Sequence, residues 1–254
     1  MAAPRRRADL ALVELGLAAS RTEAQAIIMA GQAYTGTRRI EKPGQPLPED
    51  AAISVRGQAH PWVSRGGLKL VHALDHFGLS PEGRACLDIG ASTGGFTDVL
   101  LTRGAARVTA VDVGHGQLAW KLRSDPRVLV RERLNARYIT EDDVPGPVEA
   151  LVCDASFIGL RTILPAPLAL CGPGAWAVAL IKPQFEAGPG AVGARGVVRD
   201  PDVHARVCAT IEAWWSALPG WRVLGLTPSP ITGPEGNVEF LIAATRDVGR
   251  SAVV

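Results

Sequence analysis

The chain has 254 residues, 47% of them hydrophobic and 20% charged, which is typical of a soluble globular protein with one domain of moderate size and a small one. Its net charge of +2 does not by itself indicate a nucleic-acid partner, although the basic excess lies in the N-terminal part. Gly172, Pro173 and Gly174 break the most apolar stretch and the four cysteines lack metal-ligand spacing, so we expect a cytoplasmic protein with buried free thiols, no membrane span and no metal site.

Residues 1–59 predict a small α+β domain. Asp9–Leu17 reads as a short helix, and Ser20–Glu23 is a capping-box pattern that opens a second helix. This second helix passes through Met29 and ends at Gly31. Short β-prone pieces, separated by glycine and proline, follow at residues 33–35, 38–41 and 53–55.

This module resembles the S4-type RNA-binding domain over residues 5–10, 15–17 and 20–31. The resemblance implies a helix pair that lays a basic face on structured RNA. The candidate phosphate contacts are its arginines, Arg5, Arg6, Arg7, Arg21 and Arg38. A solvated basic face on another kind of interaction domain is the alternative.

Residues 60–64 are the expected linker. Trp62 within it is expected to pack the two domains together, and its alternative role is to transmit RNA binding to the second domain. Residues 65–246 form the expected second domain, and residues 247–254 are a C-terminal tail.

Strands and helices alternate along the second domain, which predicts an α/β fold with a Rossmann-like, seven-stranded, doubly wound sheet. A helix over Gly66–Phe77 comes first, and the clearest later helices are Phe96–Arg103 and Val203–Leu218, the latter opened by Asp200 and Pro201. No long helix separates the last two strands, so the final strand is expected to be antiparallel. The expected strands are Ala85–Ile89, Val108–Val111, Val128–Arg131, Ala150–Cys153, Trp176–Ile181, Arg222–Leu226 and Val238–Ala243.

The first of these strands runs into a loop of small residues that opens a helix. Its spacing, Gly90-x-x-x-Gly94-Gly95, differs from the Gly-x-Gly-x-x-Gly of nicotinamide-dependent oxidoreductases, which disfavours that class. The loop resembles the S-adenosylmethionine (SAM) loop of methyltransferases, in which small residues let the backbone approach the ligand. The candidate cofactor residues here are Asp88, Gly90, Ala91, Ser92, Thr93, Gly94, Gly95 and Phe96.

Two further polar residues follow the next strands. Asp112 ends the second strand about 20 residues after the loop, where an acid can accept hydrogen bonds from both hydroxyls of a ribose, and an ordinary strand-end acid is the alternative. Asn135 follows the third strand, where such folds meet the adenine, and a turn residue is an equal alternative. For Asp88 we expect a direct or water-mediated contact with the methionine ammonium.

Four charged residues interrupt apolar segments of the second domain. Asp154 and Lys182 end neighbouring strands, where a charge is costly unless it is paired or lies at an opening. With Lys69 and Glu239 they resemble the Lys-Asp-Lys-Glu tetrad of FtsJ-like ribose methyltransferases. The alternatives are a solvated helix lysine for Lys69, a structural ion pair for Asp154 and Lys182, and an edge-strand charge for Glu239.

The residue types suit methyl transfer to a ribose hydroxyl. Transfer from a sulfonium is an in-line displacement that needs alignment and removal of a proton. We expect Lys182 nearest the 2′-oxygen, as a neutral base or as a cation, with the other three residues setting its protonation and orientation. Asp154-Ala155-Ser156-Phe157 lacks the prolines of enzymes that methylate exocyclic amines, and the chain lacks the Pro-Cys pair of pyrimidine carbon methylation.

Taken together, the S4-like start, the loop and the tetrad resemble the TlyA family of rRNA 2′-O-methyltransferases, historically called hemolysin A. Residues 62–70, 182–186 and 229–237 extend the resemblance over nearly the whole chain. It implies 2′-O-methylation of cytidine, with SAM as cofactor and ribosomal RNA or ribosomal subunits as partners. Arg195 and Arg199, in a glycine-containing loop, are further candidate RNA contacts, with a plain surface loop as the alternative.

Three other functions were weighed. A pore-forming hemolysin is suggested only by the older family name. A non-catalytic RNA-binding protein is disfavoured by the complete tetrad, and a pseudouridine synthase, which often carries an S4-type domain, by the SAM-like loop and the alternating fold.

Overall fold

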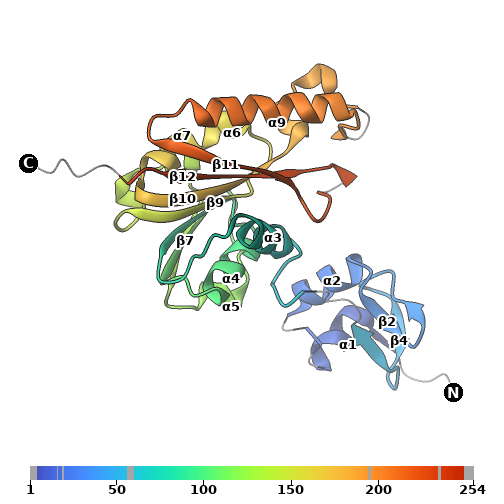
Figure 1. Cartoon of the computed structure of the whole chain (residues 1–254). Helices are drawn as coiled ribbons and strands as arrows, with labels where there is room; N and C mark the ends of the chain where they lie inside the picture. The colour runs from blue at the N-terminus through green and yellow to red at the C-terminus, as the bar shows by residue number, and fades with distance from the viewer. Residues whose placement is uncertain are drawn as a thin grey trace, which may run out of the picture. The chain divides into compact units, whose positions relative to one another are not determined.

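The computed structural model describes residues 5–15, 17–18, 20–55, 60–193, 196–233 and 236–248. The chain divides into two compact units, Met1–Pro61 and Trp62–Val254 (Figure 1). The boundary falls within the expected linker, and Trp62 belongs to the second unit. There the Trp62 side chain lies so close to Gly67 that a Cβ atom at Gly67 would come within 2.6 Å of the indole.

The first unit builds a helix pair and two small sheets. Ser20 caps the second helix, because its hydroxyl accepts a hydrogen bond from the amide of Glu23 at 3.2 Å. The first helix ends at Glu14 rather than Leu17, because the Leu17 amide donates to the Leu12 carbonyl and closes the turn. The elements are β1 (Arg5–Arg7), α1 (Ala8–Glu14), α2 (Arg21–Met29), β2 (Ala33–Thr35), β3 (Arg38–Arg39), β4 (Pro46–Pro48) and β5 (Ile53–Val55), with β1 paired to β4 and β2 between β3 and β5.

A buried carboxylate holds this unit together. Asp9 in α1 is fully buried and accepts hydrogen bonds from Arg7 at 2.9 Å, Arg21 at 3.0 Å and Gln25 at 3.1 Å. The bond from Arg7 is the main cause that holds the pKa of Asp9 well below its usual range. One carboxylate therefore joins β1, α1 and α2.

The second unit is built on the predicted seven-stranded sheet, and its strands lie in the order β11-β12-β10-β9-β6-β7-β8. Strands β10, β9, β6, β7 and β8 are mutually parallel, and β12 runs antiparallel to both β10 and β11. The strand bounds are β6 (Ala85–Ile89), β7 (Arg107–Asp112), β8 (Val128–Glu132), β9 (Val148–Cys153), β10 (Cys171–Ile181), β11 (Trp221–Pro228) and β12 (Phe240–Arg246).

Helices cover both faces of this sheet (Figure 1). On one face, α3 (Gly67–Phe77), α4 (Gly95–Thr102) and α5 (Trp120–Arg123) bury an apolar cluster that includes Leu70, Val99 and Leu122. On the other face, α6 (Leu160–Ile163), α7 (Pro165–Ala169) and α9 (Pro201–Ser216) bury a second cluster around Trp215. The short α8 (Pro183–Glu186) follows β10. Among the described helices, none combines the length and the apolar character needed to span a bilayer.

One strand boundary differs from the sequence prediction in a way that concerns function. The last strand begins at Phe240, so Val238 and Glu239 precede it instead of lying within it. Strand β12 is antiparallel to β10, and Phe240 pairs with Ile181 at the carboxyl end of β10. The residue before β12 therefore arrives at the same edge as the residue after β10.

We predict that Asp9→Ala lowers the free energy of unfolding of the first unit by roughly 2 kcal/mol, because two arginines and a glutamine lose their shared buried acceptor. Hydrogen exchange on the full-length chain should show faster exchange of the α2 amides and unchanged exchange in the central strands of the second unit. Asp75→Ala is the control, since it removes only an exposed ion pair with Arg103. Equal protection of α2 in the two variants would contradict the prediction.

Candidate active site

Two cavities open at the carboxyl ends of the parallel strands. The first, of about 500 Å³, lies over the ends of β6, β7 and β9, and the second, of about 320 Å³, extends toward α3. Gly90, Ser92, Asp154 and Ser156 line both of them. A volume of this size in the first cavity is ample for a nucleoside ligand.

The loop after β6 needs glycine at two positions. Gly90 has φ +79°, and a Cβ atom there would come within 2.9 Å of the Cα atom of Ala155. Gly94 has φ +99°, and a Cβ atom there would collide with Leu122 of α5. The loop is therefore pressed between the β9 loop on one side and α5 on the other, which leaves Ala91, Ser92, Thr93, Gly95 and Phe96 to line the second cavity.

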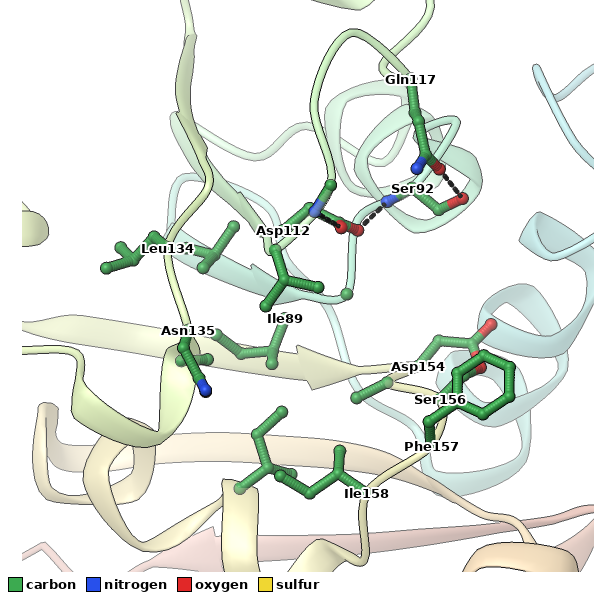
Figure 2. A pocket seen from close by; sticks show the side chains of 17 residues that line it. Ile89, Ser92, Asp112, Gln117, Leu134, Asn135, Asp154, Ser156, Phe157 and Ile158 are labelled. Atoms are coloured by element: carbon green, nitrogen blue, oxygen red, sulfur yellow. Dashed lines mark hydrogen bonds between the residues drawn. The ribbon is translucent and has the colours of Figure 1, made fainter.

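Asp112 and Asn135 both lie at the first cavity, as Figure 2 shows. The Asp112 carboxylate accepts hydrogen bonds from the amide of Ser92 at 2.8 Å and from the amide of Gly114 at 2.7 Å. Because a carboxylate has about four lone-pair sites, further acceptor capacity remains for a ligand hydroxyl. Asn135 accepts from the amide of Arg137 at 3.1 Å, and its side chain lies at the cavity next to Leu134.

Asp88 lies beneath the loop and lines neither cavity. It is fully buried, and one of its oxygens accepts from the Thr97 hydroxyl of α4 at 2.6 Å. Asp88 is thus separated from both cavities by the loop, and the expected direct or water-mediated contact with the methionine ammonium stays a prediction. Burial raises the pKa of Asp88 to about 7. The hydrogen bond from Thr97 opposes this rise, and the negative charges of Asp154 and Asp112 add to it.

The four tetrad residues come together although their sequence positions are far apart: Lys69, Asp154 and Lys182 line the second cavity, and Glu239 lies buried behind Lys69. Lys182 lies 2.7 Å from one Asp154 oxygen, and Lys69 lies 3.8 Å from the other. Lys69 also bonds to Glu239 at 2.6 Å, across 170 residues of sequence. The result is a row of alternating charges, Lys182, Asp154, Lys69 and Glu239.

Burial distinguishes the members of this row. Lys69 is 6% exposed, Lys182 7% and Glu239 1%, whereas the Asp154 side chain is 21% exposed. Solvated charges would lie open to water, so the burial argues against a solvated helix lysine for Lys69 and an edge-strand charge for Glu239. Each buried charge has an opposite charge within 4 Å, which meets the requirement for charges taken out of water.

The sequence did not single out Ser156, which contacts the tetrad directly. Lys182 donates to the Ser156 hydroxyl at 2.8 Å and to the backbone carbonyl of Asp154 at 3.2 Å. The next residue, Phe157, is 90% exposed at the cavity mouth and has a φ of +65° (Figure 2). The one sequence feature that could have pointed to Ser156 is its position two residues after Asp154, the acid that follows β9.

Another buried acid, Asp98, fixes a segment that lines the second cavity. Asp98 of α4 is 2% exposed and accepts from the amide of Val63 at 2.9 Å and from Lys121 at 2.9 Å. Ser64, Arg65 and Gly66, which follow Val63, line the cavity beside Lys69.

The predicted RNA-contacting arginines fall into three groups. Arg7 and Arg21 bind the buried Asp9, and Arg6 pairs with Glu14. Arg5, Arg38 and Arg199 are exposed. Arg195 lies outside the described residues. No cluster of three or more histidine, cysteine, aspartate or glutamate side chains within the described ranges could hold a metal ion.

Comparison with known proteins gives a consistent result. Residues 62–246 match the family model of FtsJ-like methyltransferases. The chain is 48% identical over 241 residues, 94% of its length and 90% of the relative's, to the 16S/23S rRNA (cytidine-2′-O)-methyltransferase TlyA of Mycobacterium tuberculosis. It is 40% identical over 230 residues, 89% of its length and 94% of the relative's, to hemolysin A of Brachyspira hyodysenteriae.

Among solved structures, a Streptococcus thermophilus protein named as a hemolysin is similar with a TM-score of 0.75 and 43% identity. The alignment covers 97% of this chain and 90% of that one. The similarity thus extends over both units.

We predict that Asp88 makes stability fall with rising pH. Its pKa is about 7 in the folded chain against an ordinary 3.8. Between pH 3.8 and pH 7 the folded state therefore binds more protons than the unfolded state. The free energy of unfolding should therefore decrease as the pH rises through this range, and level off above pH 7. Denaturant titrations from pH 5 to pH 8 should show a decrease in wild type larger by roughly 2 kcal/mol than in Asp88→Asn. Parallel curves for the two proteins would refute the assignment.

Proposed function

The chain belongs to the FtsJ-like methyltransferase family, and we propose that it transfers the methyl group of SAM to the ribose 2′-hydroxyl of cytidine in ribosomal RNA. The observation that carries this proposal is the buried row of Lys182, Asp154, Lys69 and Glu239 beside the glycine loop. The reaction forms a bond between the 2′-oxygen and the methyl carbon and breaks the bond between that carbon and sulfur. The bonding pair goes to sulfur, and the hydroxyl proton is released to water.

The residues of the first cavity fit the cofactor. Asp112 offers lone pairs to the ribose hydroxyls, and the apolar side chains Ile89, Leu134 and Ile158 provide walls for the adenine, with Asn135 at their edge. The cofactor supplies the electrophilic methyl group, whereas the protein supplies alignment and charge. The place where the two cavities share Gly90 and Ser156 is where methyl donor and acceptor can meet.

Lys182 is the proposed contact of the 2′-oxygen. It reaches the region shared by the cavities, and Asp154 holds its ammonium group from two oxygens. Lys69 lies behind Asp154 and is in turn neutralised by the buried Glu239. Lys69 and Glu239 thereby fix the position of Asp154, and Asp154 fixes that of Lys182.

The partner is proposed to be ribosomal RNA, on its own or in ribosomal subunits, in the cytoplasm where ribosomes assemble and work. The relatives named TlyA act, by their names, on 16S and 23S or on 23S rRNA. Arg5 and Arg38 have no carboxylate within ion-pair distance among the described residues, so of the predicted RNA contacts in the first unit they are the most available to phosphates.

We predict that Lys182→Ala lowers methyl transfer at least about 100-fold while SAM affinity stays within about twofold, because the residue acts on the acceptor oxygen. Transfer of labelled methyl to ribosomal subunits, followed by mapping of 2′-O-methyl positions, measures the first quantity, and calorimetry the second. Arg222→Ala is the control, since it removes an exposed cation from β11. The proposed function is wrong if wild type labels no ribose, and the role of Lys182 is wrong if its variant keeps full turnover.

Asp112→Ala should weaken SAM binding by about tenfold or more, because a charged acceptor for two hydroxyls is lost. Transfer measured at saturating SAM should recover substantially, which separates a binding defect from a catalytic one. Asp142→Ala, at an exposed acid of the 3₁₀ helix Glu141–Asp143, is the matched control. Unchanged SAM affinity in Asp112→Ala would rule out this residue as the ribose ligand.

A further inference from the structure

We propose that Ser156 is a positioning residue for methyl transfer, whose hydroxyl fixes the ammonium group of Lys182 at the meeting point of the two cavities. The inference rests on the proposed function and adds a fifth residue to the four of the tetrad. Three independent features of the structure support it: the coordination of Lys182, the place of Ser156 between the cavities, and the shape of the loop that carries it.

The coordination of Lys182 is complete only with Ser156. An ammonium group has three N–H donors. Lys182 directs them to the Asp154 carboxylate at 2.7 Å, the Asp154 backbone carbonyl at 3.2 Å and the Ser156 hydroxyl at 2.8 Å. Asp154 alone offers only two acceptors to the ammonium group, one carboxylate oxygen and its backbone carbonyl. The third N–H donor is satisfied by Ser156.

Ser156 is also the acceptor that an incoming substrate meets. It is exposed and lines both cavities, whereas Lys182 lines only the second. The Ser156 oxygen receives a hydrogen bond from Lys182 and still carries its own proton and another lone pair. A ribose hydroxyl entering between the cavities therefore finds Lys182 and Ser156 together, with the ammonium already aligned.

The loop that carries Ser156 adopts a strained conformation. Phe157 has a φ of +65°, a left-handed conformation that is unfavourable for a bulky residue. Such strain persists where surrounding contacts require it, and it is concentrated at functional sites.

Three contacts hold this loop to the segment after β10. Lys182 bonds to Ser156, the rings of Phe157 and Phe185 lie with centroids 5.2 Å apart, and the Glu186 carboxylate accepts from the Leu160 amide at 2.6 Å. All three join residues 156–160 to residues 182–186. These contacts fix the conformation of the loop, in which the Ser156 hydroxyl accepts the hydrogen bond from Lys182.

The test compares Ser156→Ala with Ser156→Thr, which keeps the hydroxyl. Ser124→Ala, which removes an exposed hydroxyl bonded to the Trp120 carbonyl at 2.9 Å, is the matched control. We expect Ser156→Ala to lower kcat for rRNA methylation about 10- to 30-fold, in the range for a lost positioning interaction, with KM for RNA and SAM affinity within about twofold. Ser156→Thr should recover to within about threefold of wild type.

A second readout is independent of turnover. In wild type, the ¹⁵N-labelled ammonium of Lys182, assigned by its absence in Lys182→Arg, should give a slowly exchanging NMR signal. In Ser156→Ala this signal should exchange faster and broaden, and in Ser156→Thr it should return.

Two outcomes would overturn the inference. One is wild-type kcat in Ser156→Ala, and the other is equal impairment of the Ala and Thr variants with an unchanged Lys182 signal, which would indicate an effect of the loop and not of the hydroxyl. Either result leaves the proposed function intact provided that wild type methylates rRNA ribose. Absence of that wild-type activity would instead refute the proposed function.

Discussion

Two lysines and Glu239 lie buried at one edge of a sheet beside the partly exposed Asp154, and each of these charges is paired with an opposite charge among the four. Asp154 has a lysine on either side, and Glu239, 1% exposed, closes the row through Lys69. Such buried ion pairs add little to stability compared with apolar residues of similar volume. A fold that keeps these three linked ion pairs beside one cavity therefore has a reason other than stability, and the proposed alignment of an acceptor oxygen supplies one. The glycine loop, the strained loop after β9 and the antiparallel last strand all serve to bring these charges together.

Much of the second unit could be predicted because its patterns are local. The strands are apolar runs bounded by acids, glycines or prolines, and Asp200 caps α9 through a hydrogen bond to the Asp202 amide, as expected. Asp154 and Lys182 end parallel strands, so a simple rule of α/β sheets brings them to the same edge. Glu239 was expected inside a strand and instead precedes it. The strand begins where Phe240 pairs with Ile181, and the apolar pattern of the sequence does not show where this long-range pairing starts.

What sequence reasoning could not find depends on backbone turns and on long-range partners. The contact between Ser156 and Lys182 lies in a loop in which Phe157 is left-handed, and no propensity predicts that conformation for phenylalanine. In the first unit, strand β1 consists of three arginines and β4 contains two prolines, residues with little strand signal. Counting arginines also gave no sign that Arg7 and Arg21 are held by a buried aspartate. The basic face available to RNA is therefore smaller than composition suggests.

The bond between Lys69 and Glu239 spans 170 residues and depends on a strand that enters the sheet last in chain order. During translation, α3 and the cofactor loop emerge early, but Lys69 has no buried carboxylate to close the row until residue 239 has left the exit tunnel and β12 has paired between β10 and β11. Nascent chains can therefore acquire the cofactor half of the fold well before they acquire a working centre. If the four charged residues act as proposed, chains that end before residue 239 and β12 lack the row and are expected to carry no activity.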